Sequence, residues 1–273
     1  MDKATIFKEL HHNGKLLVLP NVWDPLSALL LESLGYKALA TASASIAYSN
    51  GYHDGENMPF EEVIHMLTKI VNSVNIPVTA DIESGYATTN SDLKENIKKL
   101  IDTGISGINF EDSKHNKAEL VSIEEQGEKI SLIRKIADQK NSKLFINARS
   151  DVYLKGGNLT EEEKLEETIR RGNGYKDAGA DGFYPMILKD GSKIERVISE
   201  VNLPINILLL SGIPDFDELQ KMKLARLSLG PGFLKIALKA MKDLGEKLLN
   251  YEGMEEVKNN PVTGDYLNSL LKN

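Results

Sequence analysis

Acidic side chains gather at the ends of two short apolar runs in the middle of the chain. One run ends in Asp81 and is followed two residues later by Glu83, and the next run ends in Glu111. On an extended segment Asp81 and Glu83 would project to the same side, and Glu111 would approach from the adjacent strand. Three converging carboxylates repel one another unless a cation neutralises them, and their hard oxygens suit Mg²⁺, with Mn²⁺ as the alternative. The acids therefore predict a divalent-metal site and an enzyme, unless helix N-termini and Arg149 satisfy them instead.

Two further segments could bind the anionic groups of a substrate. Arg149 follows an apolar run, and its planar guanidinium can hold a carboxylate through two parallel hydrogen bonds. The alternative for Arg149 is a structural ion pair with Asp151. The segment Ser43-Ala44-Ser45 also follows an apolar run and is predicted to be a turn. Its backbone N–H groups could face an oxyanion, although an ordinary polar loop explains the turn equally well.

These residues lie where short β-type runs end, and the runs alternate with longer amphipathic segments. That alternation is typical of βα units around a parallel sheet. The candidate strands cover residues 16–19, 38–42, 78–81, 107–111, 144–148, 182–184, 205–208 and 225–228. Eight units predict an α/β fold of the TIM-type (β/α)8 barrel class, in which catalytic groups sit at the C-terminal strand ends. An open doubly wound sheet is the alternative, but its glycine-rich dinucleotide motif is absent after the first strand.

Helical patterns fill the segments between the strands, and a distinct tail follows them. The main helical patterns cover residues 25–34, 59–74, 91–102, 124–138, 160–178 and 231–249. Asp24-Pro25 and the segment from Thr160 to Glu163 have the residue types of N-terminal caps. We expect a single barrel domain over residues 1–273, with a C-terminal helical tail from about residue 250 to residue 273. This tail either docks on a neighbouring subunit or packs on its own barrel.

The composition excludes several classes of protein. The 273 residues are 41% hydrophobic and can bury one large core. A formal net charge of −7 provides no basic footprint for nucleic acid or for an anionic membrane surface, so a small-molecule partner is expected. The absence of cysteine excludes disulfides, thiolate metal sites and a cysteine nucleophile. The sequence contains no pattern of a signal peptide or a membrane span, so we expect a cytoplasmic protein.

Five motifs lie around the candidate site residues: PNVWDPLSALLLESLGYKALATASASIAYSNGYHDGE from residue 20, VTADIESGY from residue 78, GINFED from residue 107, INARSDVY from residue 146 and RLSLGP from residue 226. Together these motifs resemble the isocitrate lyase and phosphoenolpyruvate mutase superfamily, especially its carboxyvinyl-carboxyphosphonate phosphorylmutase-like members. The likeness extends to about residue 240. It implies a Mg²⁺-dependent barrel that breaks a C–C or P–C bond and stabilises an enolate-like anion.

The resemblance also implies roles for individual residues. Asp81 matches the direct metal ligand, which also contacts the substrate, and Glu83 and Glu111 match metal ligands that act partly through water. Asp54 matches a further water-mediated ligand and, with Glu111, belongs to the implied catalytic set. Relatives exchange C-terminal helices between subunits, which implies a homo-oligomer, either a dimer or a tetramer.

On the substrate side, Ser43 and Ala44 fall in the substrate-binding turn of the family. Arg149 matches the arginine that binds the substrate carboxylate and completes the catalytic set.

Three departures from the family pattern narrow the activity. The isocitrate and methylisocitrate lyases carry a cysteine in a conserved loop, and this chain has none, so those two activities are not expected. The gating loop after Glu111-Asp112 is shortened to residues 113–120, where Lys114, His115 and Asn116 either face the site or belong to a solvated loop. Met186 stands where relatives use a histidine or a glutamate.

The first hypothesis is a lyase or hydrolase that cleaves a C–C bond of a small 2-oxo acid or dicarboxylate such as an oxaloacetate-like compound. A P–C mutase or hydrolase acting on a phosphonate such as phosphonopyruvate is the second. A phosphate-binding aldolase barrel is suggested by Gly230-Pro231-Gly232 before the last long helix, although no lysine ends a predicted strand. A non-catalytic binding barrel is the remaining alternative.

Overall fold

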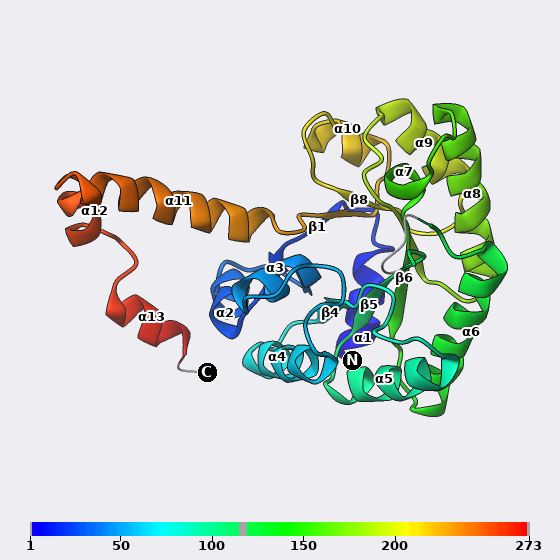
Figure 1. Ribbon diagram of the computed structural model, residues 1–273, viewed down its shortest axis with the longest axis horizontal. Coiled ribbons are helices and arrows are strands. Elements are labelled where there is room, and N and C mark those ends of the chain that lie inside the picture. Colours follow the sequence, from blue (N-terminus) through cyan, green and yellow to red (C-terminus); the bar gives the residue numbers. More distant parts are fainter. Residues whose placement is uncertain (1, 115–118, 272–273) are drawn as a thin grey trace.

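The computed structural model describes residues 2–114 and 119–271, which form a barrel of parallel strands with helices around it (Figure 1). The strands are β1 (Leu17–Leu19), β2 (Asn21–Val22), β3 (Leu39–Thr41), β4 (Val78–Asp81), β5 (Gly107–Glu111), β6 (Phe145–Ser150), β7 (Gly182–Pro185), β8 (Asn206–Leu208) and β9 (Arg226–Ser228). All the pairings between these strands are parallel.

Two sheets join to close the ring. Strands β2 to β7 pair in chain order, and β1, β9 and β8 form a second sheet. Only Pro20 separates β1 from β2, and a parallel bridge between Phe183 and Ile205 links β7 to the residue before β8. The predicted (β/α)8 barrel is therefore confirmed. The predicted first strand, residues 16–19, corresponds to β1, whereas β2 was not predicted. Proline has no N–H to donate, and the chain changes partner at Pro20, from β9 to β3.

The helices cover the outside of the barrel and extend beyond it. They are α1 (Lys3–Leu10), α2 (Pro25–Ser33), α3 (Ser43–Ser49), α4 (Phe60–Ser73), α5 (Asn90–Asp102), α6 (Ile123–Gln139), α7 (Val152–Lys155), α8 (Glu161–Asp177), α9 (Gly191–Glu200), α10 (Phe216–Lys221), α11 (Gly232–Leu249), α12 (Met254–Lys258) and α13 (Gly264–Leu270). The expected caps are present, because Asp24 begins α2 and Thr160 begins α8 with reciprocal capping boxes. No helix in the described ranges has the length and apolar character needed to traverse a bilayer.

The interior of the barrel changes from apolar to polar along its axis. At the N-terminal strand ends, α1 packs Phe7 against Leu19 and Phe145. Side chains two residues apart on a strand share a face, so Asn147 and then Arg149 follow Phe145 on the inner face of β6. The C-terminal half of the barrel therefore has a polar interior, and this is the end where the predicted site residues lie.

Two local expectations about the site segments were wrong. The segment Ser43-Ala44-Ser45 is the first turn of helix α3 and not an isolated turn. Strand β4 ends at Asp81, and Glu83 has a left-handed backbone with φ of 52°. The extended geometry that would place Asp81 and Glu83 on one side is therefore absent, because the chain turns between them.

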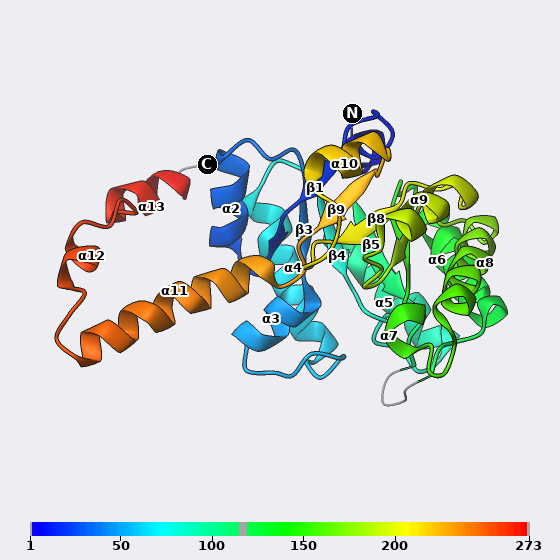
Figure 2. The ribbon, with the colours of Figure 1, turned by 90° about the horizontal axis from the view of Figure 1, so that it is seen from above.

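The C-terminal helices leave the barrel and return to it. Helix α11 projects away from the strands, and α12 and α13 turn back toward α2 (Figures 1 and 2). Helix α13 contacts α2 and buries Leu270, with Tyr266 packed against the main core. The end of the tail thus packs on its own barrel, while much of α11 stands clear of it.

Candidate active site at the mouth of the barrel

A cavity of about 570 Å³ opens at the C-terminal ends of the strands. Five of the predicted site residues line it, namely Ser43, Ala44, Asp54, Asp81 and Arg149. The barrel thus brings together residues that are more than one hundred positions apart in the sequence. Glu83 and Glu111 are buried behind these residues and do not line the cavity.

Asp81 is held by the start of α3. Its Oδ2 atom accepts a hydrogen bond of 2.9 Å from the hydroxyl of Ser43 and one of 3.4 Å from the Ser43 backbone N–H. Its Oδ1 atom is buried and has no hydrogen-bond partner within the described residues. A buried carboxylate oxygen without a partner is costly, so this atom is suited to a ligand or a cation that the protein itself does not supply.

Glu83 is fixed by the loop before α4 and by its own turn. Its Oε2 atom accepts from the backbone N–H of Glu56 at 2.8 Å, and its Oε1 atom accepts from the hydroxyl of Tyr86 at 3.0 Å. Burial raises the pKa of Glu83 to about 7, and the charge of Asp81 adds to the increase. Glu83 therefore has both oxygens engaged by protein donors and acts on the site through its charge.

Arg149 contacts two carboxylates, those of Asp151 and Glu111, and also lines the cavity. The ion pair with Asp151 and a position at the cavity are therefore both present. Its Nε and Nη2 atoms donate to the two oxygens of Asp151 at 2.6 and 3.0 Å, and its Nη1 atom lies 2.8 Å from Glu111 Oε2. Burial raises the pKa of Glu111 to about 8; Arg149 opposes this increase, while Asp151 and Asp81 add to it. These contacts use three of the five N–H donors of Arg149, and the guanidinium still lines the cavity.

The remaining wall carries Asp54 and the first turn of α3. Asp54 lies on the loop after α3, and burial together with the charge of Asp81 raises its pKa. Ser43 and Ala44 are the first two residues of α3, where backbone N–H groups have no partner within the helix. This wall therefore combines backbone N–H donors with a carboxyl group whose pKa is raised by burial and by Asp81.

The acids of the cavity fit a divalent cation that has one direct protein ligand and keeps several of its waters. Within residues 2–114 and 119–271, no three acidic or histidine side chains form a group that could ligate a metal directly. Among the buried side-chain atoms in these ranges, Asp81 Oδ1 is the carboxylate oxygen without a hydrogen-bond partner, and burial is the main cause of the raised pKa values of Glu83 and Glu111 nearby. One direct ligand with water-mediated acids suits Mg²⁺, which retains several of its waters. The assignment of Asp81, Glu83 and Glu111 as metal ligands stays a prediction.

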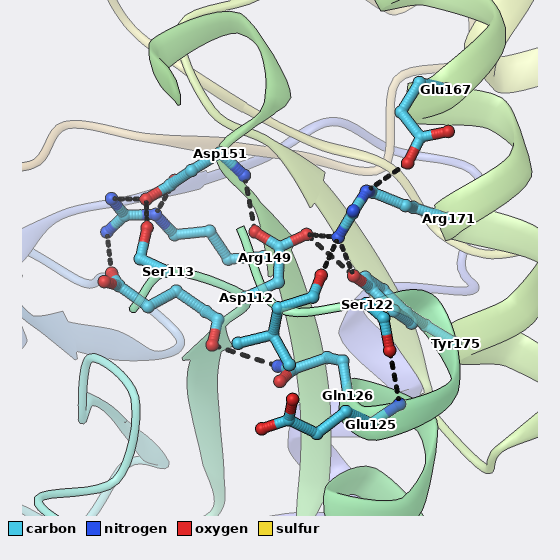
Figure 3. A network of polar contacts seen from close by, with 12 residues as sticks. Asp112, Ser113, Ser122, Glu125, Gln126, Arg149, Asp151, Glu167, Arg171 and Tyr175 are labelled. Atoms are coloured by element: carbon cyan, nitrogen blue, oxygen red, sulfur yellow. Dashed lines mark hydrogen bonds and ion pairs between the residues drawn. The ribbon is translucent and has the colours of Figure 1, made fainter. Parts of the chain in front are cut away.

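Behind Arg149 lies a buried network that the sequence did not reveal (Figure 3). Asp112 is fully buried and accepts from Arg171 Nη1 at 2.8 Å, from the Tyr175 hydroxyl at 2.7 Å and from the Asp151 backbone N–H at 2.9 Å. The hydroxyl of Ser113 also donates to Asp151. The network connects α8 to the partner of Arg149. Its only sequence signal is the spacing of Arg171 and Tyr175, which places both on the buried face of α8.

The shortened loop, residues 113–120, is described by the structure only at its two ends. Ser113 and Leu120 form an antiparallel bridge, and Lys114 lies 3.9 Å from Glu119. Lys114 borders a separate hollow and does not line the cavity that contains Asp81. His115 and Asn116 lie outside the described residues.

The far rim of the cavity is built by the last βα unit. Gly230, Pro231 and Gly232 line it, together with Lys235 in the first turn of α11 and Met186 after β7. The amide of Asn21 fixes this rim, because its Oδ1 accepts from the backbone N–H groups of Leu229 and Gly230. The glycine-rich segment therefore shapes the mouth of the site.

Comparisons with known proteins agree with this arrangement. A relative in Mycobacterium tuberculosis (strain ATCC 25618 / H37Rv), an uncharacterized protein, is 32% identical over 82% of this chain and 81% of its own length. A 2-methylisocitrate lyase of Halalkalibacterium halodurans is 27% identical over 93% of this chain and 84% of its own length. An oxaloacetate decarboxylase of Pseudomonas entomophila is 26% identical over 76% and 70% of the two chains.

The fold also matches a solved phosphonopyruvate hydrolase in complex with oxalate and Mg²⁺. The two chains superpose with a TM-score of 0.86 at 22% identity, over 99% of this chain and 95% of that one. The family model described as phosphoenolpyruvate phosphomutase matches residues 7–249, which include every strand and every residue of the cavity discussed above. On this evidence the chain belongs to the phosphoenolpyruvate phosphomutase family, within the isocitrate lyase and phosphoenolpyruvate mutase superfamily that its motifs resemble.

Proposed function

We propose that the protein is a Mg²⁺-dependent lyase or hydrolase that cleaves a C–C bond of a small 2-oxo acid or dicarboxylate of the oxaloacetate type. The observation that carries this proposal is the pairing, in one cavity, of the unpartnered Oδ1 of Asp81 with the guanidinium of Arg149. A substrate that chelates a cation and carries a carboxylate matches both groups. The oxaloacetate decarboxylase among the relatives and the oxalate complex of the structural neighbour support this class of substrate.

Asp81 would hold the ion, with Asp54 acting through bound water at the cavity wall and Glu83 and Glu111 acting from behind it through their charge. A bound Mg²⁺ would polarise the 2-oxo and carboxylate oxygens and lower the energy of an enolate-like anion. The chain itself supplies the orientation of the substrate and the movement of protons. The two N–H donors of Arg149 that Asp151 and Glu111 do not use would bind the carboxylate, and the backbone N–H of Ala44, at the start of α3, would face the oxyanion.

Asp54 is the candidate proton donor. Its pKa is raised by burial and by Asp81, so it retains a proton to higher pH than an ordinary aspartate. Cleavage leaves an enolate carbon that takes up a proton, and an acid at the rim of the cavity can deliver it. Glu111 fixes Arg149 through the 2.8 Å ion pair and thereby sets the position of the carboxylate.

Cleavage of a P–C bond in a phosphonate is the second candidate. The family model is named for a phosphomutase, and the structural neighbour is a phosphonopyruvate hydrolase. Both reactions need the same stabilised enolate, so the same residues would serve either substrate. Turnover of a panel of 2-oxo acids and phosphonates distinguishes them.

The central test is a thermal-shift titration with Mg²⁺, with Mn²⁺ and with oxalate. Wild type should show a melting temperature that rises on the order of 5 °C or more when metal and oxalate are present together near 100 times the dissociation constant. Asp81→Ala should lose this rise. Asp243→Ala, which removes an exposed acid on α11 far from the cavity, should retain it. An unchanged rise in Asp81→Ala, or no metal-dependent effect of oxalate on wild type, would refute the proposal.

A further inference from the structure

A layer of polar side chains lies directly beneath the cavity, inside the barrel. We call it the floor layer, and it consists of Asn109, Asn147, Asn206, Arg226 and Ser228. Asn109 and Asn147 are register partners on β5 and β6, and Asn206 and Arg226 are register partners on β8 and β9. Asn109 and Ser228 line the cavity, whereas Arg226 lies below them. None of these residues was singled out by the sequence motifs as part of the site.

The hydrogen bonds of the floor layer fix the orientation of the Asn109 amide. Its Oδ1 atom accepts from Asn147 Nδ2 at 2.8 Å and from Arg226 Nη2 at 3.3 Å. Both donors lie within the barrel, so the carbonyl side of the amide faces away from the cavity. The Nδ2 group, with two N–H donors, is therefore the polar group that Asn109 offers to a ligand.

Arg226 places a positive charge under this amide. It is 0% exposed, and no acidic side chain forms an ion pair with it within the part of the chain that the structure describes. Its Nε donates to Ser228 at 3.0 Å, while its Nη1 has no hydrogen-bond partner among the described residues. Isolated buried charge is strongly unfavourable, and an anion bound above it would offset that cost.

Ser228 links Arg226 to Asn206 within the floor layer. Its hydroxyl accepts from Arg226 Nε and donates to Asn206 Oδ1 at 3.1 Å. Since its proton is committed to Asn206, Ser228 offers no donor to the cavity. The Asn109 amide therefore donates to a ligand in the cavity, while its oxygen accepts from the positively charged Arg226 below.

We propose that Asn109 binds a second anionic oxygen group of the substrate and that Arg226 is the positioning residue that turns the Asn109 amide toward it. The site would then prefer 2-oxo dicarboxylates over 2-oxo monocarboxylates: one carboxylate lies at Arg149 and the other on the floor. This preference rests on the proposed function, because it concerns the same cavity and the same bound metal. The floor layer itself is a separate set of residues from Asp81 and Arg149.

The test compares two ligands that differ in the second carboxylate. The dissociation constants of 3,3-difluorooxaloacetate and 3,3-difluoropyruvate are measured by calorimetry with saturating Mg²⁺, and their ratio is the readout. A ratio cancels any general effect of a substitution on metal binding. In wild type the dicarboxylate should bind about tenfold more tightly or better, which is the scale of one hydrogen bond to a charged group.

Asn109→Asp is the decisive variant. The aspartate keeps an acceptor for Asn147 and Arg226, so the barrel should fold, but it replaces the N–H donors with a negative charge. We expect the preference for the dicarboxylate to disappear or to reverse. Arg226→Met should reduce the preference, and Arg226→Lys should restore part of it. Thr168→Val, an isosteric change at a buried polar residue of α8 outside the cavity, should leave the ratio at its wild-type value.

Each outcome has one meaning. An Asn109→Asp protein that folds and keeps the wild-type ratio within about twofold would overturn the role of the floor, and so would a wild type that does not prefer the dicarboxylate. Neither result would affect the metal-dependent binding of oxalate, so the proposed function would stand. If wild type bound neither ligand nor oxalate with Mg²⁺, the proposed function would fall, and the inference with it. Should Arg226→Met fail to fold, Asn109→Asp and Arg226→Lys still decide the question.

Discussion

Two arginines on neighbouring helices show that burial, and not the number of ion pairs, determines how much a charged residue contributes to the free energy of unfolding. Arg171 on α8 contacts Asp112 and Glu167, and its side chain is 7% exposed. Arg196 on α9 contacts three acids, Glu162, Glu166 and Glu200, but its side chain is 35% exposed. Water screens the pairs of Arg196, whereas Asp112, the partner of Arg171, is fully buried and depends on Arg171 for a positive charge.

Substitution of these arginines should therefore have unequal effects. We expect Arg171→Met to lower the free energy of unfolding by about 3–5 kcal/mol, because Asp112 would stay buried without its cation. Arg196→Met should lower it far less, because water screens the ion pairs of Arg196. Urea unfolding followed by circular dichroism measures both. Equal losses, or a larger loss for Arg196→Met, would contradict this reading of the network in Figure 3.

At the scale of elements, helix α1 closes the end of the barrel opposite the active site and carries a histidine that cannot easily take a proton. His11, at the C-terminal cap of α1, stacks on Phe145, and its Nδ1 lies 2.8 Å from the carbonyl oxygen of Phe7. Burial lowers the pKa of His11 to about 3, and the positive charge of Arg226 contributes to the decrease. The imidazole is therefore neutral in the folded protein across the physiological range.

This histidine predicts a loss of stability in acid. Between pH 6.5 and 3 the unfolded chain binds a proton at His11 that the folded chain does not, so the free energy of unfolding falls as pH falls. The contribution between pH 7 and pH 5 is about 2 kcal/mol. His11→Phe should lack this contribution, so the difference in free energy of unfolding, wild type minus variant, should fall by about 2 kcal/mol from pH 7 to pH 5. His12→Gln, at the exposed neighbour, should leave the curve unchanged. A flat difference curve for His11→Phe would show that His11 takes up its proton over the same pH range in the folded and unfolded states.

The strands that position the acids could be predicted because their signal is local. Residues 78–81 and 107–111 are apolar runs with an acid at the end, and the structure gives β4 and β5 the same bounds. Asp81 and Arg149 were placed in one cavity by the rule that parallel strands end at the same rim. The left-handed backbone of Glu83 was not predicted by this rule, since it depends on the turn that follows the strand and not on the strand itself.

The floor layer could not be read from the sequence for a different reason. Asn109 and Arg226 are 117 residues apart and meet only because the barrel closes. An asparagine or an arginine inside an apolar run looks like an irregularity until its partners across the barrel are known. Arg171 and Tyr175 are similar, because the polar composition of α8 conceals which of its residues are buried.

At the scale of the whole molecule, α11 leaves an apolar stripe without cover. Leu234, Leu238, Met241 and Leu248 recur at helical spacing along one face, and only Leu234 is buried in the single chain. Met241 is 70% exposed, and Tyr251 just beyond the helix is 98% exposed. A projecting helix with such a face is typical of a contact between subunits. Figure 2 shows that α11 extends well beyond the barrel of the same chain.

We therefore expect a homo-oligomer in which α11 of one subunit contacts another. Light scattering should give a mass of at least twice 30.2 kDa at micromolar concentration. The double substitution Leu238→Gln and Met241→Gln should shift the mass toward a single chain, because it removes the apolar stripe without adding charge. Lys239→Gln with Lys242→Gln, at the exposed residues between, should leave the assembly intact. A wild type of 30.2 kDa at every concentration would mean that the stripe has no partner in a second copy, and the reason for the projecting helix would have to lie elsewhere.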